Sequence, residues 1–182
     1  MKKMLSSFCI IAIILTFTFV PVSAMESSEK ISVILETGDT LIFNNEYDYN
    51  LYLTKQNPEL RNVTATITVS TEYQKHKLIG PTNLTPSWVK TDLYTISRGR
   101  NYSSSGSVSY KNLSGNISTS YSSSVQFSMK ANELRYSKIG LYADLTVQHK
   151  RDYITDMNTG RVTEVNYLQV RATETYLAII YK

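Results

Sequence analysis

Alternation of apolar and polar residues is the feature that most constrains how this chain can fold. Successive side chains of a β-strand point to opposite faces, so alternation predicts a strand with one covered face. The clearest run spans residues 62–73 and predicts a half-buried strand, with one face made by Val63, Ala65, Ile67, Val69, Thr71 and Tyr73. Alternation also occurs at residues 47–53, 139–147, 161–170 and 174–181, whereas helical spacing does not recur. An all-β fold is therefore expected.

Turn sequences separate the predicted strands. Thr37-Gly38-Asp39 lies between two short apolar runs and predicts a hairpin, because glycine adopts the backbone angles that a tight turn needs. Residues 156–160 form a second turn sequence, and residues 74–90 form the longest irregular stretch. Strands spaced by about 10 to 15 residues with turns between them indicate an antiparallel architecture. We expect residues 25–182 to form one antiparallel β-sandwich or barrel-like sheet.

The N-terminus has the features of a secretory signal peptide. Lys2 and Lys3 precede an apolar run that ends in Val22-Ser23-Ala24, and the run from Leu5 to Val20 is shorter than the ~20 residues that span a membrane. We expect cleavage after Ala24 and an extracellular protein, with a short lysine-led signal typical of Gram-positive bacteria. The single cysteine, Cys9, lies inside this signal. The mature chain therefore has no disulfide.

Charge and motif content argue against several functional classes, although folding can still bring two acidic residues together as a catalytic pair. Loss of two lysines from 19 basic residues leaves a mature chain nearly balanced against 15 acidic residues, which does not favour a nucleic-acid partner. No nucleophile, zinc or phosphate-loop motif occurs, and His76 and His149 each stand alone beside basic residues. We therefore expect no enzyme activity and assign no catalytic residue, cofactor or metal ligand.

Residues 101–130 form a serine-rich segment without acidic residues. Its second half places Ile117, Tyr121, Val125 and Phe127 on one face and mainly serine on the other, and its first half sorts Tyr102, Val108 and Tyr110 in the same way. Residues 112–116 supply glycine and asparagine between the halves, which is turn chemistry. The segment is predicted to be a β-hairpin with arms 102–111 and 117–127.

Three roles for this hairpin are compatible with its sequence. It can be an ordinary solvent-facing pair of strands, whose serines prevent edge aggregation. It can be an interaction surface for a cell-wall glycan or a protein, for which the candidate residues are Trp88, Tyr102, Tyr110, Lys111 and Tyr121.

The third role is membrane insertion. Serine-rich alternation, uncharged arms and a basic residue near the tip, Lys111, resemble the inserting hairpin of aerolysin-type β-pore-forming toxins. The resemblance implies that copies oligomerise, because strands in lipid must close a barrel. The candidate membrane-facing residues are Val108, Ile117, Val125 and Phe127.

The sequence favours a secreted, disulfide-free binding or interaction module, and membrane insertion of the hairpin is the alternative. The partner is then a cell-wall glycan, a protein or a membrane surface, and an oligomer is expected only for the membrane-active alternative. The position of the hairpin distinguishes the two functions. Arms paired within the main sheet would favour an ordinary structural role, whereas a ribbon folded over the sheet would favour deployment.

Overall fold

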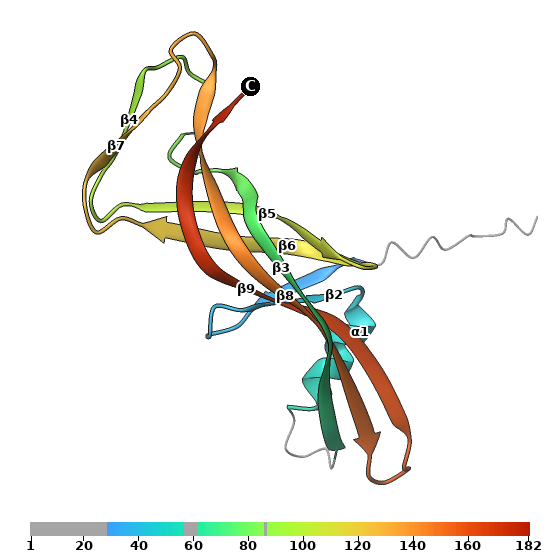
Figure 1. Cartoon of the computed structure of the whole chain (residues 1–182). Helices are drawn as coiled ribbons and strands as arrows, with labels where there is room; N and C mark the ends of the chain where they lie inside the picture. The colour runs from blue at the N-terminus through green and yellow to red at the C-terminus, as the bar shows by residue number, and fades with distance from the viewer. Residues whose placement is uncertain (1–28, 57–61, 86) are drawn as a thin grey trace, which may run out of the picture.

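A computed structural model describes residues 29–56, 62–85 and 87–182 (Figure 1). The predicted signal peptide, residues 1–24, lies outside these residues. The elements in chain order are β1 (Ile31–Ile34), β2 (Thr40–Phe43), α1 (Glu46–Thr54), β3 (Asn62–Pro81), β4 (Leu93–Ile96), β5 (Asn101–Tyr110), β6 (Leu113–Ser122), β7 (Phe127–Lys130), β8 (Ser137–Asp156) and β9 (Val162–Tyr181). Strands predominate and pair antiparallel, so the predicted all-β class is confirmed.

A five-stranded sheet forms the centre of the molecule, in the order β1-β2-β9-β8-β3. Its three main strands, β3, β8 and β9, have 20 residues each, so each is about 65 Å long at the usual rise per residue. The predicted turn at residues 37–39 joins β1 to β2, with Gly38 at φ 82°. The predicted turn at residues 156–160 joins β8 to β9, with Gly160 at φ 68°. Both turn predictions are confirmed.

Residues 46–54 form a helix, and the strand predicted there from the alternation of 47–53 is wrong. Asn45 caps the helix, because its side-chain Oδ1 accepts a hydrogen bond from the backbone N–H of Asp48 at 2.8 Å. Glu46 and Asp48 lie in the first turn, where acidic side chains interact favourably with the helix dipole. An N-cap asparagine followed by acidic residues is a helix-start signal that outweighs the short alternating pattern.

The strand predicted at residues 62–73 is present, but the face predicted to be buried is exposed. β3 is an edge strand, and on the face predicted to be buried Ile67, Val69 and Tyr73 are exposed, at 44%, 40% and 73%. The opposite face of β3 is only partly covered: Thr64 and Ser70 are half-buried, whereas Thr66 is exposed although it donates a hydrogen bond of 2.6 Å to the buried carboxylate of Asp152 on β8. Alternation shows that the two faces differ, but a neighbouring element decides which face is covered.

The two faces of the sheet are covered at different heights. α1 packs on the lower end of one face, where Phe43 and Tyr167 join Tyr49 and Tyr52 of the helix in an aromatic cluster. The other face is covered by β5 and β6 across its middle and by β4 and β7 at its upper end (Figure 1). The hairpin of β5 and β6 therefore completes the main core as a separate layer.

A docked serine-rich hairpin as the candidate functional site

β5 and β6 form a hairpin that pairs only with itself among the described residues. The strands pair from Asn101 with Ser122 to Tyr110 with Leu113, and a two-residue turn at Lys111 and Asn112 joins them. Lys111 adopts the left-handed region, at φ 55°. The hairpin is thus a ribbon that crosses the sheet (Figure 1), which is the arrangement that favours deployment.

The limits of the hairpin differ from the prediction. The loop predicted at residues 112–116 is mostly strand, since β6 begins at Leu113, and the second arm ends at Ser122. Val125 therefore lies in the segment after the hairpin, and Phe127 lies in β7. The glycine and asparagine of 112–116 resembled turn residues, but Gly115 serves close packing and Lys111 provides the left-handed turn angle.

The inner face of the hairpin carries six large side chains among its ten positions, which are Tyr102, Val108, Tyr110, Leu113, Ile117 and Tyr121. Tyr102, Val108, Leu113 and Ile117 are almost completely buried. The last three pack on apolar side chains of the sheet, which are Ile42, Ile79, Ala143, Leu145, Val147, Leu168 and Val170. Between them the inner face holds small residues, which are Ser104, Gly106, Gly115 and Thr119. The interface is therefore apolar, with small residues between the large ones.

Two glycines allow this ribbon to approach the sheet closely. A Cβ added to Gly106 would lie 2.1 Å from the backbone oxygen of Ile79 on β3. A Cβ added to Gly115 would lie 2.4 Å from Cγ2 of Ile42 on β2. Both distances are below van der Waals contact, so the docked position requires glycine at both sites.

The outer face of the hairpin is almost entirely hydroxyl. Serines 103, 105, 107 and 109 on β5 face the same way as Ser114, Asn116 and serines 118, 120 and 122 on β6. Ser105 and Ser118 form a cross-strand hydrogen bond with a distance of 2.8 Å between their Oγ atoms. The hairpin thus has an apolar face toward the sheet and a hydrated face toward solvent.

Scattered hydrogen bonds connect the hairpin to the rest of the protein. Ser32 Oγ on β1 accepts from the backbone N–H of Asn116 at 3.1 Å, and the carbonyl oxygen of Ser103 accepts from the N–H of Asn83 at 3.0 Å. Thr175 on β9 donates to the carbonyl oxygen of Ser120 at 3.2 Å. No strand ladder joins the hairpin to the described part of the sheet. Asn83 also accepts from the N–H of Ser103 at 3.0 Å, Ser104 donates to the carbonyl oxygen of Pro81 at 3.0 Å, and Gln74 donates to that of Ser109 at 3.3 Å. Among the described residues, undocking therefore breaks one backbone–backbone hydrogen bond, between Asn83 and Ser103, and several bonds that involve a side chain.

β4 and β7 continue the hairpin in the same register. The last pair of the β5–β6 ladder is Asn101 with Ser122. Five residues farther along each arm, Ile96 of β4 pairs with Phe127 of β7, so the two ladders share one register. Two bends, at residues 97–100 and 123–126, separate the two ladders. The N–H of Gly99 donates to the carbonyl oxygen of Ser123 at 2.8 Å, so the bends themselves are linked. The base of the hairpin is thus attached directly to the ribbon of β4 and β7.

The residues predicted as an interaction surface are not brought together in one place. Tyr102 is buried, and Tyr110 and Tyr121 are half-buried with their rings against core clusters. Lys111 is exposed at the tip, with Nζ 5.5 Å from the ring centroid of Tyr110. Trp88 lies at the upper end of the sheet, away from the tip. Of the predicted membrane-facing residues, Val108 and Ile117 lie on the inner face of the hairpin.

His149 on β8 is buried on the hairpin side of the sheet. Burial lowers the pKa of its imidazole below the usual value, and the positive charges of Lys111 at the hairpin tip and of Arg151 lower it further. His149 is therefore neutral at neutral pH. Its protonation would place a buried charge beside the lysine of the tip.

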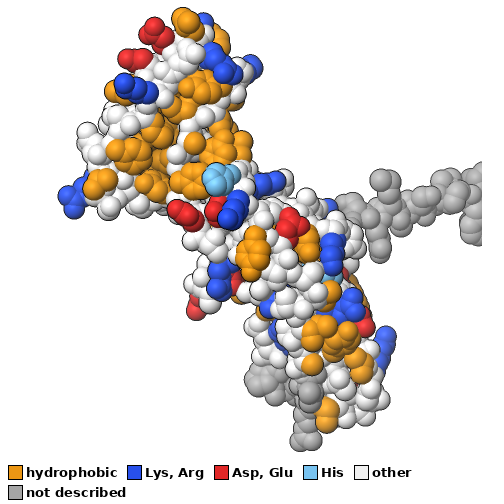
Figure 2. Space-filling view, in the orientation of Figure 1, with side chains coloured by type: hydrophobic (Ala, Val, Ile, Leu, Met, Phe, Trp, Pro, Cys, Tyr) orange, Lys and Arg blue, Asp and Glu red, His pale blue; other side chains and the backbone are white. Residues whose placement is uncertain are grey.

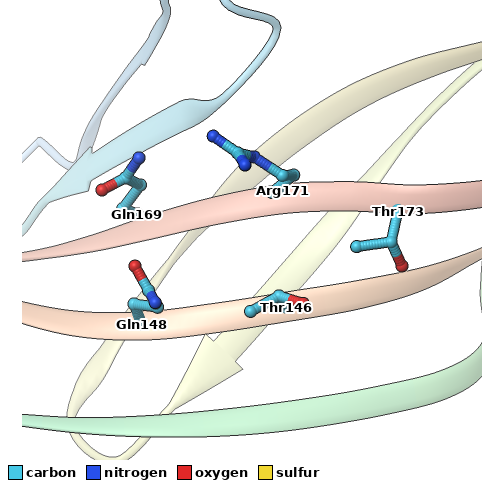
Figure 3. Close-up of a pocket in the computed structure, with 5 residues that line it drawn as sticks. All are labelled: Thr146, Gln148, Gln169, Arg171 and Thr173. Carbon is cyan, nitrogen blue, oxygen red and sulfur yellow. The ribbon is translucent and has the colours of Figure 1, made fainter.

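A polar concavity of about 200 Å³ occupies the middle of the opposite face of the sheet (Figure 3). Its lining residues are Thr146 and Gln148 of β8 with Gln169, Arg171 and Thr173 of β9. Arg171 donates two hydrogen bonds, of 2.7 and 2.8 Å, to the buried carboxylate of Asp39, and they hold the pKa of Asp39 below its usual value. Sequence reasoning missed this site because Asp39 and Arg171 are 132 residues apart.

Within residues 29–56, 62–85 and 87–182, no cluster of three or more His, Cys, Asp or Glu side chains is positioned to hold a metal ion. In the same residues, no helix has the length and apolar character required to cross a membrane. Comparison of the chain with protein-family models, with curated proteins and with solved structures finds no match.

Proposed function

We propose that this protein is secreted and permeabilises membranes by inserting the hairpin of β5 and β6. The observation that carries the proposal is that the hairpin is a self-paired, two-faced ribbon folded over the sheet without a ladder to it. A ribbon of this kind can leave the sheet as a unit, because the hydrogen bonds between β5 and β6 stay intact when the hairpin moves.

The dimensions and faces of the hairpin suit a bilayer. Each arm has 10 residues, and tilted strands of about 9–11 residues span the hydrocarbon core. The inner face, with Tyr102, Val108, Leu113 and Ile117, would meet lipid, and the serine face would line water. Unpaired strand edges are not tolerated in lipid, so hairpins from several copies would pair edge to edge into a closed ring.

The contact between the hairpin and the sheet is stable in water, but it can be exchanged for a contact with lipid. Four almost fully buried side chains on the hairpin contribute about 1.5–3 kcal/mol each, or roughly 6–12 kcal/mol together. Exposure of this face to water is therefore strongly unfavourable. Transfer of the same face into hydrocarbon restores most of the apolar contribution, so lipid can replace the sheet as the partner of the hairpin.

A disulfide that fastens the hairpin to the sheet tests this proposal. A Cβ on Gly80 of β3 would lie 2.7 Å from Ser104 Oγ on β5, near the about 3 Å that separates a Cβ from the far sulfur of a disulfide. The variant Gly80→Cys with Ser104→Cys should therefore form this bond. The only native cysteine is Cys9 in the predicted signal peptide, so no other pairing competes in the mature chain.

The matched control places the disulfide inside the hairpin, as Ser105→Cys with Ser118→Cys, which links β5 to β6 and leaves the ribbon free to move. Dye release from vesicles of phosphatidylcholine with phosphatidylglycerol is the assay. The locked variant should be inactive when oxidised and active after reduction, whereas the control should be active in both states. Equal activity of the oxidised and reduced lock, or no release by any form from any vesicle composition, would refute the proposal.

A second candidate function, binding of an extracellular glycan or protein, is supported by the polar concavity around Arg171. The amide group of Gln148 and the hydroxyl group of Thr146 can exchange hydrogen bonds with sugar hydroxyls. Gln169 and Thr173 already donate to Asp39 and to the carbonyl oxygen of Asp144, and their oxygen atoms can still accept hydrogen bonds. Retention of the protein on bacterial cell-wall material, lost in Gln148→Ala and unchanged by the hairpin lock, would favour this function.

A further inference from the structure

The upper end of the main sheet has an apolar face on the side opposite the ribbon of β4 and β7. The register brings Leu78, Tyr142 and Tyr176 into one row across β3, β8 and β9. Ile180 lies farther along β9, opposite Lys138. Leu78 is 42% exposed, and the other apolar members are half-buried and belong to none of the three core clusters. We name Leu78, Trp88, Tyr142, Tyr176 and Ile180 the upper face.

The composition of this end is that of a membrane interface. Figure 2 shows hydrophobic side chains gathered over the upper end of the molecule. Tyrosine and tryptophan are enriched where proteins meet lipid headgroups, because their rings are apolar and their edges are polar. Cations lie over three aromatic rings here, with 5.1 Å from Lys138 Nζ to Trp88, 5.1 Å from Lys90 Nζ to Tyr136 and 4.6 Å from the Arg135 guanidinium to Tyr181.

Positive charge is concentrated in the same part of the molecule. Segments 75–100, 123–144 and 174–182 hold nine lysine and arginine residues against four acidic residues, an excess of five positive charges. Two of the acidic residues, Asp144 and Glu174, are paired across β8 and β9 next to Tyr142 and Tyr176. The whole chain has a formal net charge of +4, so the remainder is net negative. An anionic partner is therefore favoured at this end, and contact with a second copy through the same face is disfavoured by repulsion.

The length of the hairpin places the membrane near the same end. Arms of 10 residues are just sufficient to cross the hydrocarbon core, so no arm residues remain to bridge a gap. Both arms connect to β4 and β7 through the bends at 97–100 and 123–126. The end of the molecule that carries β4 and β7 must therefore lie near the membrane surface when the hairpin is inserted. Because the upper face lies on the other side of the sheet from β4 and β7, the two bends, which span about 13 Å each when extended, must carry the chain past the sheet to the bilayer.

We propose that the upper face docks on an anionic phospholipid bilayer before the hairpin leaves the sheet. This inference rests on the proposed membrane function. Trp88, Tyr142 and Tyr176 enter the headgroup layer, and lysines such as Lys90 and Lys182 contact the phosphates. Docking brings the base of the hairpin to the bilayer while the hairpin is still folded on the sheet.

The experiment uses the oxidised Gly80→Cys, Ser104→Cys protein, because the lock prevents insertion and leaves docking intact. Flotation with phosphatidylcholine vesicles, with and without phosphatidylglycerol, measures binding. The locked protein should float with the phosphatidylglycerol vesicles, and added salt should weaken this binding. Lys90→Glu with Lys182→Glu should weaken it about fivefold for each lysine charge removed.

Apolar variants test the face itself. Leu78→Ser with Ile180→Ser should lower binding by about tenfold or more, because two apolar contacts with lipid are lost. Val69→Ser is the matched control, since Val69 on β3 has a similar exposure, 40%, and lies outside the upper face. It should bind as the parent does. The charge variants at exposed positions provide a test that does not depend on how well the apolar variant folds.

The outcomes separate this inference from the proposed function. If the unlocked protein releases dye and the locked protein does not bind vesicles, membrane insertion stands and docking through the upper face is refuted. If the locked protein binds through the upper face and the unlocked protein never releases dye, docking stands and insertion is refuted. Equal binding by the parent and both sets of variants, or binding to an anionic polysaccharide but not to vesicles, would contradict the upper face as a lipid surface.

Discussion

Substitution of Gly106 by alanine should weaken the docked hairpin. The new Cβ would lie 2.1 Å from the backbone oxygen of Ile79, and the backbone of β3 cannot turn aside as a side chain could. The hairpin would have to move outward by about 1 Å, and a gap of that size removes a quarter to a half of the dispersion attraction between facing atoms. Overpacking of this kind typically costs about 1–3 kcal/mol.

The effect should appear in two measurements. Thermal unfolding should shift downward by about 2–12 °C, since 1 kcal/mol corresponds to about 2–4 °C in a domain of this size. The undocked population should increase by about 5- to 150-fold, and dye release should become faster. Ser107→Ala, on the outer face of the same strand, should change neither. Unchanged unfolding and unchanged dye release for Gly106→Ala would show that the hairpin does not lie this close to β3.

Three further predictions concern the buried charged and titratable groups. Lys55→Met should destabilise the protein by about 3 kcal/mol or more in urea unfolding, because it leaves the buried carboxylate of Asp152 without the lysine that lies 2.6 Å away; adding Asp152→Leu should recover much of the loss. Because the pKa of His149 is lowered in the folded state, the unfolded chain binds more protons below about pH 6.5, so stability should fall as the pH drops below that value. His149→Gln should flatten this decline, and an unchanged pH profile would contradict the role given to the buried imidazole. Arg171→Gln should cost about 1–2 kcal/mol, a modest value because the arginine side chain is 60% exposed although Asp39 is buried.

The two faces of the hairpin were predictable from the sequence, whereas its turn was not. Period-two alternation places Val108 and Ile117 on the side opposite the serines in any antiparallel pairing. A lysine such as Lys111 gives no sequence signal for the left-handed backbone conformation, which glycine and asparagine adopt more readily. Gly115, with an asparagine beside it, resembled a turn residue because close backbone packing and tight turns both select glycine.

Features that depend on contacts distant in sequence could not be predicted. Ile67 alternates as a buried strand residue would, but no element packs over that face of β3 in the described structure, so its side chain is exposed. The contact of Asp39 with Arg171 and the row of Leu78, Tyr142 and Tyr176 arise only when β9 pairs with its neighbours. The helix at residues 46–54 could have been found from its capping asparagine.

The most direct test of membrane insertion is to measure which face of the hairpin meets lipid. Single cysteines at positions 103 to 110, each labelled with a fluorophore that responds to polarity, would be examined on protein bound to vesicles. Insertion predicts alternation along β5, with the labels at Ser104 and Val108 quenched by lipid-borne quenchers and the labels at Ser105 and Ser107 quenched by a water-soluble quencher. Labels that all remain accessible to the water-soluble quencher, without alternation, would contradict insertion of this hairpin.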